Sequence, residues 1–139
     1  MGSVPVADGL FTWPSDAPQL IGSQCTSCQI ITFPAQGSCP RCASTEMTEH
    51  LLSRRGRLWA WTTQHFPPPP PYAGPTGEDF VPFGVGYVEL PGEVKVETRL
   101  TACDPDVLRI GMEMELVVEP FRTDNEGNTV MTFAFRPVA

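Results

Sequence analysis

Cys25-Thr26-Ser27-Cys28 and Cys39-Pro40-Arg41-Cys42 are two Cys-x-x-Cys pairs with ten residues between them. Each pair can place two thiolates on one side of a tight turn. Four thiolates at about 2.3 Å satisfy a tetrahedral Zn²⁺ ion and leave no open position, which makes such a site structural rather than catalytic. The intervening residues 29–38 can form a strand and a return turn. The spacing therefore predicts a zinc ribbon, with one structural Zn²⁺ held by Cys25, Cys28, Cys39 and Cys42.

The same four cysteines leave other chemistry open. Two disulfides would need an oxidising compartment, and nothing in the sequence points to one. Four free thiols in a core are a second alternative. A single redox-active iron in the same sulfur tetrahedron is a third, and the colour of the protein would separate it from zinc.

The remaining chain is long enough for one small domain beside the ribbon. Of the 139 residues, 41% are hydrophobic, and the formal net charge is -7. Such a surface disfavours polyanions unless a local basic patch overrides it. About 28 residues around the cysteines cannot build a core alone and need the metal. We expect an N-terminal arm over residues 1–19, a zinc ribbon over 20–48 and an OB-fold domain over 49–139.

The sequence shows no membrane or export signal. No stretch reaches the roughly 18 apolar residues of a membrane span, and the start lacks the pattern of a secretory signal peptide. We therefore expect a cytoplasmic protein, in a compartment where reduced thiols and zinc occur together.

The expected arm contains Pro5, Pro14 and Pro18, which exclude a long regular helix. Phe11 and Trp13 lie between these prolines. They dock the arm on its own domain or on another chain, or else the arm is a frayed terminus. The sequence leaves these alternatives open.

Five segments after the ribbon have the alternation or the composition of strands. They are residues 57–64, 83–90, 94–100, 112–119 and 129–136. The glutamates of the fourth segment, Glu113, Glu115 and Glu119, are expected on a solvated face. Five mostly antiparallel strands fit an OB-type barrel, and a Greek-key sandwich is the alternative. The predicted fold class is mostly β, a zinc ribbon followed by a five-stranded OB-fold barrel.

Glycine and proline residues predict the turns and loops between these strands. Gly56 is expected to mark a bulge or turn at the start of the first strand. Asp104 and Pro105 predict one capped helical turn, which Gly111 ends. Pro67 to Pro71 form a stiff polyproline segment that cannot be a central strand. This loop runs on to Pro82, and it grips a ligand or a partner or serves as a rigid spacer.

The order of these motifs resembles the DUF35 family. The resemblance rests on the cysteine ribbon, Arg55-Gly56-Arg57-Leu58-Trp59, the proline loop, and the segments Pro82–Leu90 and Asp104–Met112. It covers about residues 10–137 and implies a rubredoxin-like zinc ribbon joined to an OB fold. Many relatives start with an amphipathic helix, which the proline-rich arm replaces here.

Members of that family typically accompany thiolase-superfamily enzymes that act on acyl-CoA. These enzymes include thiolases of anaerobic aromatic degradation and aldolases that shorten steroid side chains. The resemblance therefore implies a non-catalytic accessory subunit of an acyl-CoA thiolase or retro-aldolase complex. It implies a hetero-oligomer with a catalytic thiolase-superfamily subunit, with acyl-CoA at or near the interface.

Candidate contacts to CoA or to the partner are a basic cluster and the aromatics around the proline loop. They are Arg54, Arg55, Arg57, Phe66, Tyr72 and Phe83. Arginine forks pair phosphate bidentately, and CoA offers a few phosphates rather than a polymer. A protein that binds single-stranded nucleic acid is the alternative function, and a solvated loop is the plain alternative for the cluster.

Thiolase chemistry needs a cysteine nucleophile activated by a histidine. Four of the five cysteines are assigned to the metal, which leaves Cys103, expected to be a buried thiol. His50 and His65 are expected to be surface or partly packed residues. We therefore expect no catalytic residue in this chain.

Overall fold

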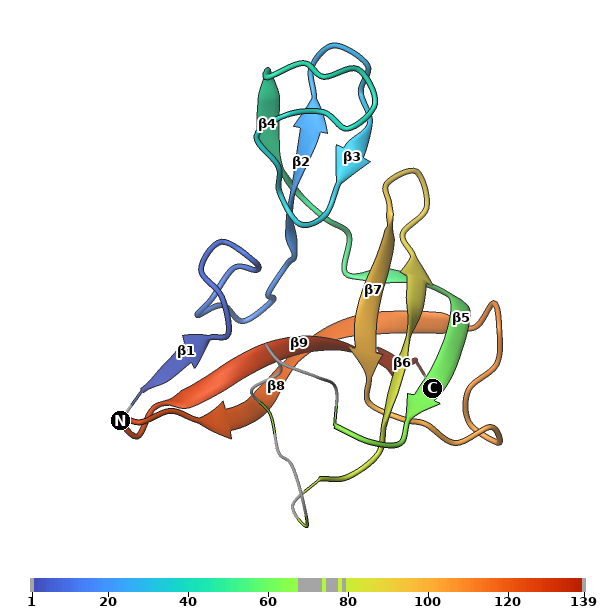
Figure 1. The fold of residues 1–139 in the computed structure, drawn as a ribbon. Coiled ribbons are helices and arrows are strands. Elements are labelled where there is room, and N and C mark those ends of the chain that lie inside the picture. Colours follow the sequence, from blue (N-terminus) through green and yellow to red (C-terminus); the bar gives the residue numbers. More distant parts are fainter. Residues whose placement is uncertain (1, 68–73, 75–77, 79, 139) are drawn as a thin grey trace.

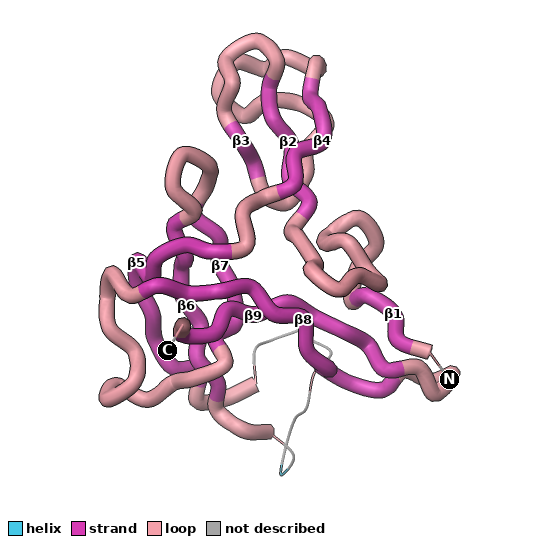
Figure 2. The backbone as a smooth tube through the Cα atoms, turned by 180° about the vertical axis from the view of Figure 1, so that it is seen from behind, coloured by secondary structure: helices cyan, strands magenta, loops and turns pink. Residues whose placement is uncertain are grey.

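The computed structural model describes residues 2–67, 74, 78 and 80–138, which form a small ribbon above a barrel (Figure 1). Seen from behind, the ribbon again lies above the barrel (Figure 2). The strands are β1 (Ser3–Pro5), β2 (Ile21–Cys25), β3 (Ile31–Thr32), β4 (Met47–Leu51), β5 (Arg55–Gln64), β6 (Phe83–Glu89), β7 (Lys95–Leu100), β8 (Glu113–Thr123) and β9 (Thr129–Pro137). Among the described residues, no helix is long and apolar enough to cross a membrane.

The five strands from β5 to β9 close into a barrel. β5 pairs with β6, β6 with β7, β7 with β9, β9 with β8, and β8 returns to β5. Only the β7–β9 pair within this ring is parallel. This connectivity is that of the OB fold, so the predicted five-stranded barrel is confirmed and the sandwich alternative is wrong.

One side of each barrel strand faces the interior. The buried set includes Leu58, Val88, Val96, Leu100, Met114, Leu116 and Phe135. The alternation predicted for residues 94–100 is confirmed, because Val96 and Leu100 are buried while Glu97 is exposed. Burial of each such side chain stabilises the fold by about 1.5–3 kcal/mol.

The register shift of β5 differs from the expected position. It lies at Trp59, between Leu58 and Ala60, and not at Gly56. Gly56 instead permits close packing, since a Cβ atom there would lie 2.4 Å from the carbonyl oxygen of Glu89. Gly56 was correctly singled out in the sequence. It is needed because the neighbouring backbone approaches closely, and not because a bulge lies there.

The expected turn after β7 is present. The carbonyl oxygen of Asp104 accepts a hydrogen bond from the N–H of Leu108 at 2.9 Å. The Asp104 carboxylate accepts another from the N–H of Asp106 at 2.8 Å. Gly111 follows with φ 88°, in the left-handed region that favours glycine.

The N-terminal arm docks on its own barrel. β1 pairs in parallel with β9, from Ser3 opposite Thr129 to Pro5 opposite Met131. Phe11 is only 3% exposed, and the indole N–H of Trp13 donates to the Ser3 hydroxyl at 3.2 Å. The aromatics of the arm therefore belong to the fold.

Ribbon and barrel meet through an aromatic joint around Phe133 of β9. The ring of Phe133 contacts Phe33 of the ribbon edge to face at a centroid distance of 5.7 Å and Phe11 of the arm at 6.5 Å. A polar contact also bridges the modules, with Nε2 of His50 on β4 2.5 Å from Oε2 of Glu93 in the β6–β7 turn. The ribbon is thus held on the barrel from two sides.

The glutamates of β8 are not equally solvated, contrary to expectation. The side chain of Glu115 is only 14% exposed and lies 2.5 Å from Arg136, 3.5 Å from Arg55 and 3.9 Å from Arg54. The hydrogen bond from Arg136 and the charges of Arg136, Arg55 and Arg54 outweigh desolvation and lower the pKa of Glu115. The sequence alone did not show that β8 and β9 pair in the register that places Glu115 opposite Arg136.

We predict that Glu115→Gln lowers the thermal midpoint of the barrel by a few degrees at pH 7. A carboxylate whose folded pKa is lowered adds stability above its ordinary pKa of about 4.3. That stability is lost as the pH falls through the folded value. The difference between variant and wild type should therefore shrink towards pH 3, as followed by the amide signals of β8 and β9. Glu119→Gln on the same strand is the matched control, and an equal, pH-independent loss in both variants would contradict the ion-pair account.

Candidate metal centre and ribbon–barrel cleft

The two Cys-x-x-Cys segments fold into the same tight turn. The N–H of Gln29 donates to the carbonyl of Cys25, and the N–H of Ala43 donates to the carbonyl of Cys39, both at 2.9 Å. Gln29 and Ala43 each follow the first cysteine of a pair by four residues and have φ of 70° and 63°. This left-handed conformation reverses the chain and keeps both cysteines of a pair on one side.

The four sulfurs form a compact cluster. The Sγ atoms of Cys25 and Cys42 are 3.5 Å apart, as are those of Cys28 and Cys39, and all four lie within 4.8 Å of one another. Zn–S bonds of about 2.3 Å in a tetrahedron set sulfurs about 3.8 Å apart. Disulfides would require about 2.05 Å, so the disulfide alternative is wrong and the donor set fits one metal ion.

The turns also prepare the sulfurs to carry negative charge. The N–H of Cys28, 3.4 Å from the sulfur of Cys25, is the main cause that lowers the pKa of that thiol to about 6. Burial raises the pKa of Cys39, but the N–H groups of Cys42 and Arg41 outweigh it and the pKa is lowered. For Cys42, the N–H of Ser44 lowers the pKa, yet the three neighbouring sulfurs and desolvation together raise it to about 12.

The raised pKa of Cys42 reflects the crowding of the four sulfurs. Four thiolates this close repel one another, so the set ionises completely only when a cation neutralises it. A tetrahedral sulfur set suits zinc, fills its coordination shell and leaves no position for water or substrate. The ion would therefore supply folding free energy to the ribbon and no reaction chemistry.

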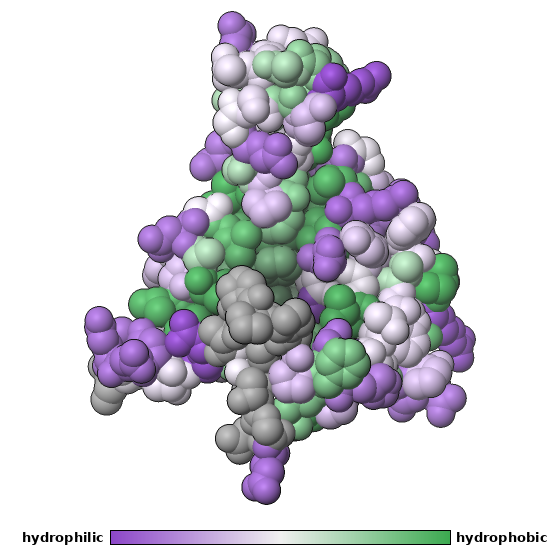
Figure 3. All heavy atoms as spheres, in the orientation of Figure 1, coloured by the Kyte–Doolittle hydropathy of each residue, from purple (hydrophilic) through white to green (hydrophobic). Residues whose placement is uncertain are grey.

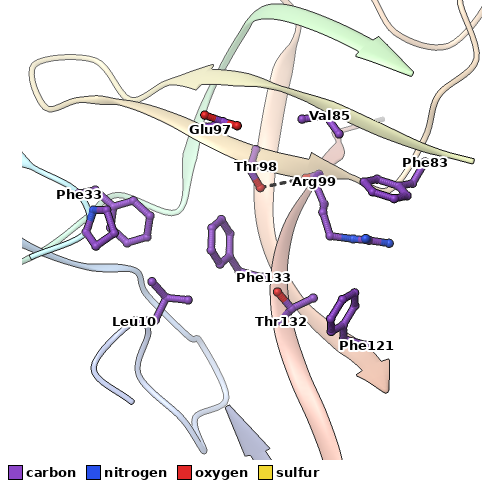
Figure 4. Close-up of a pocket in the computed structure, with 11 residues that line it drawn as sticks. Leu10, Phe33, Phe83, Val85, Glu97, Thr98, Arg99, Phe121, Thr132 and Phe133 are labelled. Atoms are coloured by element: carbon purple, nitrogen blue, oxygen red, sulfur yellow. Dashed lines mark hydrogen bonds between the residues drawn. The ribbon is translucent and has the colours of Figure 1, made fainter. Parts of the chain in front are cut away.

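A cleft of about 550 Å³ lies between the ribbon and one face of the barrel. Hydrophobic side chains gather there, below the ribbon (Figure 3). Its walls include Leu10 from the arm, Phe33 from the ribbon, Phe83 from β6, Arg99 from β7, Phe121 from β8 and Phe133 from β9 (Figure 4). The cleft therefore exists only while arm, ribbon and barrel are assembled.

The predicted basic cluster does not lie in this cleft. Arg54 donates to the carbonyl of Pro18 at 3.0 Å and to that of Leu116 at 3.1 Å. Arg55 pairs with Glu113 at 3.3 Å, in addition to Glu115. Arg57 is exposed and donates to the carbonyl of Gly111 at 3.2 Å. The structure brings these arginines to β8 and the turn before it.

The predicted aromatic contacts are spread apart. Phe83 lines the cleft, whereas Phe66 is 67% exposed just beyond β5. Tyr72 lies outside the described residues. Cys103, expected to be a buried thiol, is half-buried.

Sequence reasoning missed the cleft residues Arg99, Phe33, Phe121 and Phe133. They stand far apart in the chain, and Arg99 has the position of an ordinary solvent-facing residue on an alternating strand. Pairing of the second and third predicted strands would have set Arg99 opposite Val85, one of the cleft-lining residues. No sequence pattern indicated that the ribbon would pack over this face of the barrel.

Fold and metal centre together define a zinc-ribbon, OB-fold protein, and sequence comparison names its family. The profile of the ChsH2 rubredoxin-like zinc ribbon domain matches residues 16–48, and that of the ChsH2 C-terminal OB-fold domain matches residues 49–119. The chain therefore belongs to the ChsH2 family of zinc-ribbon and OB-fold proteins, the DUF35 proteins. The resemblance read from the sequence is confirmed.

Named relatives share most of this chain. A DUF35 domain-containing scaffold protein of Methanothermobacter thermautotrophicus is 32% identical, over 85% of this chain and 86% of its own. The benzoylsuccinyl-CoA thiolase subunit BbsA of Thauera aromatica is 30% identical, over 93% of this chain and 85% of its own. The solved Ltp2-ChsH2(DUF35) aldolase contains a chain with a TM-score of 0.61 and 26% identity, covering 87% of this chain and 86% of that one.

We predict one tightly bound zinc per chain and no colour. Cys39→Ser should lose the ion and unfold the ribbon, because zinc binding contributes about 10–16 kcal/mol in comparable sites. Elemental analysis together with the amide spectrum of β2 and β4 measures both effects. Cys103→Ser is the matched control and should keep its zinc. A folded wild-type ribbon without metal would rule the assignment out.

Proposed function

We propose that this chain is the non-catalytic accessory subunit of a thiolase-superfamily complex, an acyl-CoA thiolase or a retro-aldolase of a degradation pathway. One observation carries the proposal. The match to a thiolase subunit, BbsA, spans ribbon and barrel together, over 93% of this chain. The aldolase complex supports it with the same two modules in a second assembly.

In this proposal the catalytic cysteine and histidine belong to the partner. This chain supplies shape and excludes water at the junction, where acyl-CoA is held. Of the predicted contact residues that the structure describes, Arg55, Arg57 and Phe66 are exposed. Arg54 and Arg55 serve the ion pairs of β8, so they act on the complex through the barrel that they stabilise.

A partner surface is supported by exposed aromatics on the outside of the barrel. Trp59 is 51% exposed and Tyr87 40% exposed, and their rings meet edge to face at 6.1 Å. Nζ of Lys95 lies 4.0 Å from the Trp59 ring centroid. Aromatic residues dominate interface energetics, and a pre-ordered group loses little entropy on binding. We assign this Trp59 face, defined by Trp59, Tyr87 and Lys95, to the partner contact.

The nucleic-acid alternative has less support. It depends on a free basic cluster, and two of the three arginines face carboxylates of the same chain. Backbone phosphates would have to displace these partners before they gained any attraction.

We predict that affinity purification of the tagged chain from its native host recovers a thiolase-superfamily polypeptide, identified by peptide mass spectrometry. Native mass spectrometry of the purified chains should then show a defined hetero-oligomer. Trp59→Ser in the assigned face, and Phe66→Ser at the contact predicted from the sequence, should each weaken assembly by roughly tenfold or more, the cost of about 1.4–2 kcal/mol at an interface hot spot.

Ile110→Ser is the matched control, since Ile110 is 64% exposed in the turn before β8 and lies outside the assigned contact. It should assemble like wild type. A stable monomer that engages no thiolase-type chain would disprove the proposed function. Equal loss in all three variants would disprove the assigned face alone.

We also predict that Cys103→Ala leaves the turnover of the assembled complex within a few-fold of wild type. Cys103 is half-buried just after β7, and a role in packing affects stability rather than chemistry. Single-turnover kinetics measure this directly. Abolished turnover with zinc content and assembly intact would instead make Cys103 a nucleophile.

A further inference from the structure

Arg99 is a half-buried cation that the chain itself does not neutralise. Within the described residues, no carboxylate lies within ion-pair distance of its guanidinium and no acceptor receives its N–H groups. The half-buried Arg54, in contrast, donates to two carbonyls. Charged groups away from water are normally paired, so Arg99 calls for an explanation.

Two rings hold the Arg99 guanidinium in place. Its central carbon lies 4.0 Å from the ring centroid of Phe83 and 5.3 Å from that of Phe121, and Figure 4 shows the guanidinium extending between them. Stacking uses the flat faces of a guanidinium, whereas its five N–H donors point outward in the plane. The fork is therefore positioned with its donors available.

The rest of the cleft complements an apolar body. From Arg99 it continues past Phe133 to Phe33 and Leu10 at the ribbon end (Figure 4). The Thr132 hydroxyl adds a second polar group near Arg99, without a side-chain hydrogen bond to the described residues. A volume of about 550 Å³ lies within the range of small-molecule sites, which are mostly apolar with few polar groups.

Glu97 makes the two ends of the cleft different in charge. It lines the cleft on the same strand as Arg99, nearer to Phe33 (Figure 4), and accepts a hydrogen bond from the Tyr87 hydroxyl at 3.2 Å. Its carboxylate repels a second anionic group at that end. An occupant with one anionic head at Arg99 and an uncharged tail at Phe33 satisfies both ends.

We propose that the ribbon–barrel cleft binds small monocarboxylates with an aromatic or aliphatic body. The carboxylate accepts the forked N–H donors of Arg99, and the body packs on Phe133 and Phe33. The site belongs to this chain alone, so the proposal does not depend on which partner the chain has.

The test is a titration of the zinc-loaded, full-length, ¹⁵N-labelled chain with 4-phenylbutyrate, and in parallel with its uncharged isostere 4-phenylbutanamide. The acid should shift the Nε–H signal of Arg99 and the amide signals of Phe33 and Phe133 saturably. It should bind roughly ten- to a hundredfold more tightly than the amide, the value of a hydrogen bond to a charged group. Octanoate should compete with the aromatic acid.

Variants locate the effect. Arg99→Met keeps an apolar stem in the cleft and should abolish the preference for acid over amide. Arg99→Lys, which keeps the charge but not the fork, should retain part of it. Arg109→Met, an exposed arginine in the turn before β8, is the matched control and should bind like wild type. If Arg99→Met fails to fold, the wild-type comparison of acid with amide and the lysine variant decide.

Three results would overturn the proposal. They are equal affinity for acid and amide, shifts confined to residues outside the cleft, and no saturation up to about 10 mM acid. Cleft amides that respond only when a protein partner is added, and never to the acids, would make the cleft a partner contact and also overturn it. Because this chain is tested alone, none of these results bears on the accessory-subunit function.

Discussion

The arrangement of the molecule depends on Phe133, where arm, ribbon and barrel meet. Its edge-to-face contacts with Phe33 and Phe11 are each worth about 0.5–1.5 kcal/mol beyond area burial. Phe33 follows β3 of the ribbon, whose turns rest on the four clustered sulfurs. A ribbon of this size cannot bury a core of its own. Metal binding at one end of the ribbon is therefore coupled, through Phe33, to the wall of the cleft at the other end.

Many charged side chains of this protein are paired with one another within the chain. The chain is acidic, with a net charge of -7, and several of its arginines are spent on its own carboxylates around Glu115. The barrel closes through short seams, with three residue pairs between β5 and β8 and two between β7 and β9. The exposed Trp59 face and the Arg99 cleft are the features of the described surface best suited to recognition. One offers aromatic area and the other offers a positioned cation in an apolar hollow.

Local chemistry made the ribbon and the barrel predictable. Cys-x-x-Cys spacing reports a tight turn, and alternation from Val94 to Leu100 reports one buried face, because both depend on neighbours along the chain. Features that depend on distant pairing were missed. Glu115 was expected in water because its partner Arg136 stands on another strand. The cleft was missed because Phe33, Arg99 and Phe133 are brought together only by the fold. Gly56 was singled out for a bulge, because its close approach to Glu89 of another strand cannot be seen in the local sequence.

In the proposed function, this chain is a subunit that enables a catalytic partner without doing chemistry itself. The most direct test is to measure turnover of the purified thiolase-type chain on its acyl-CoA substrate while the zinc-loaded protein is titrated in. An accessory subunit should make turnover rise and then saturate at a fixed molar ratio, and this protein alone should be inactive. Turnover that is complete without it and unchanged by its addition would contradict this role.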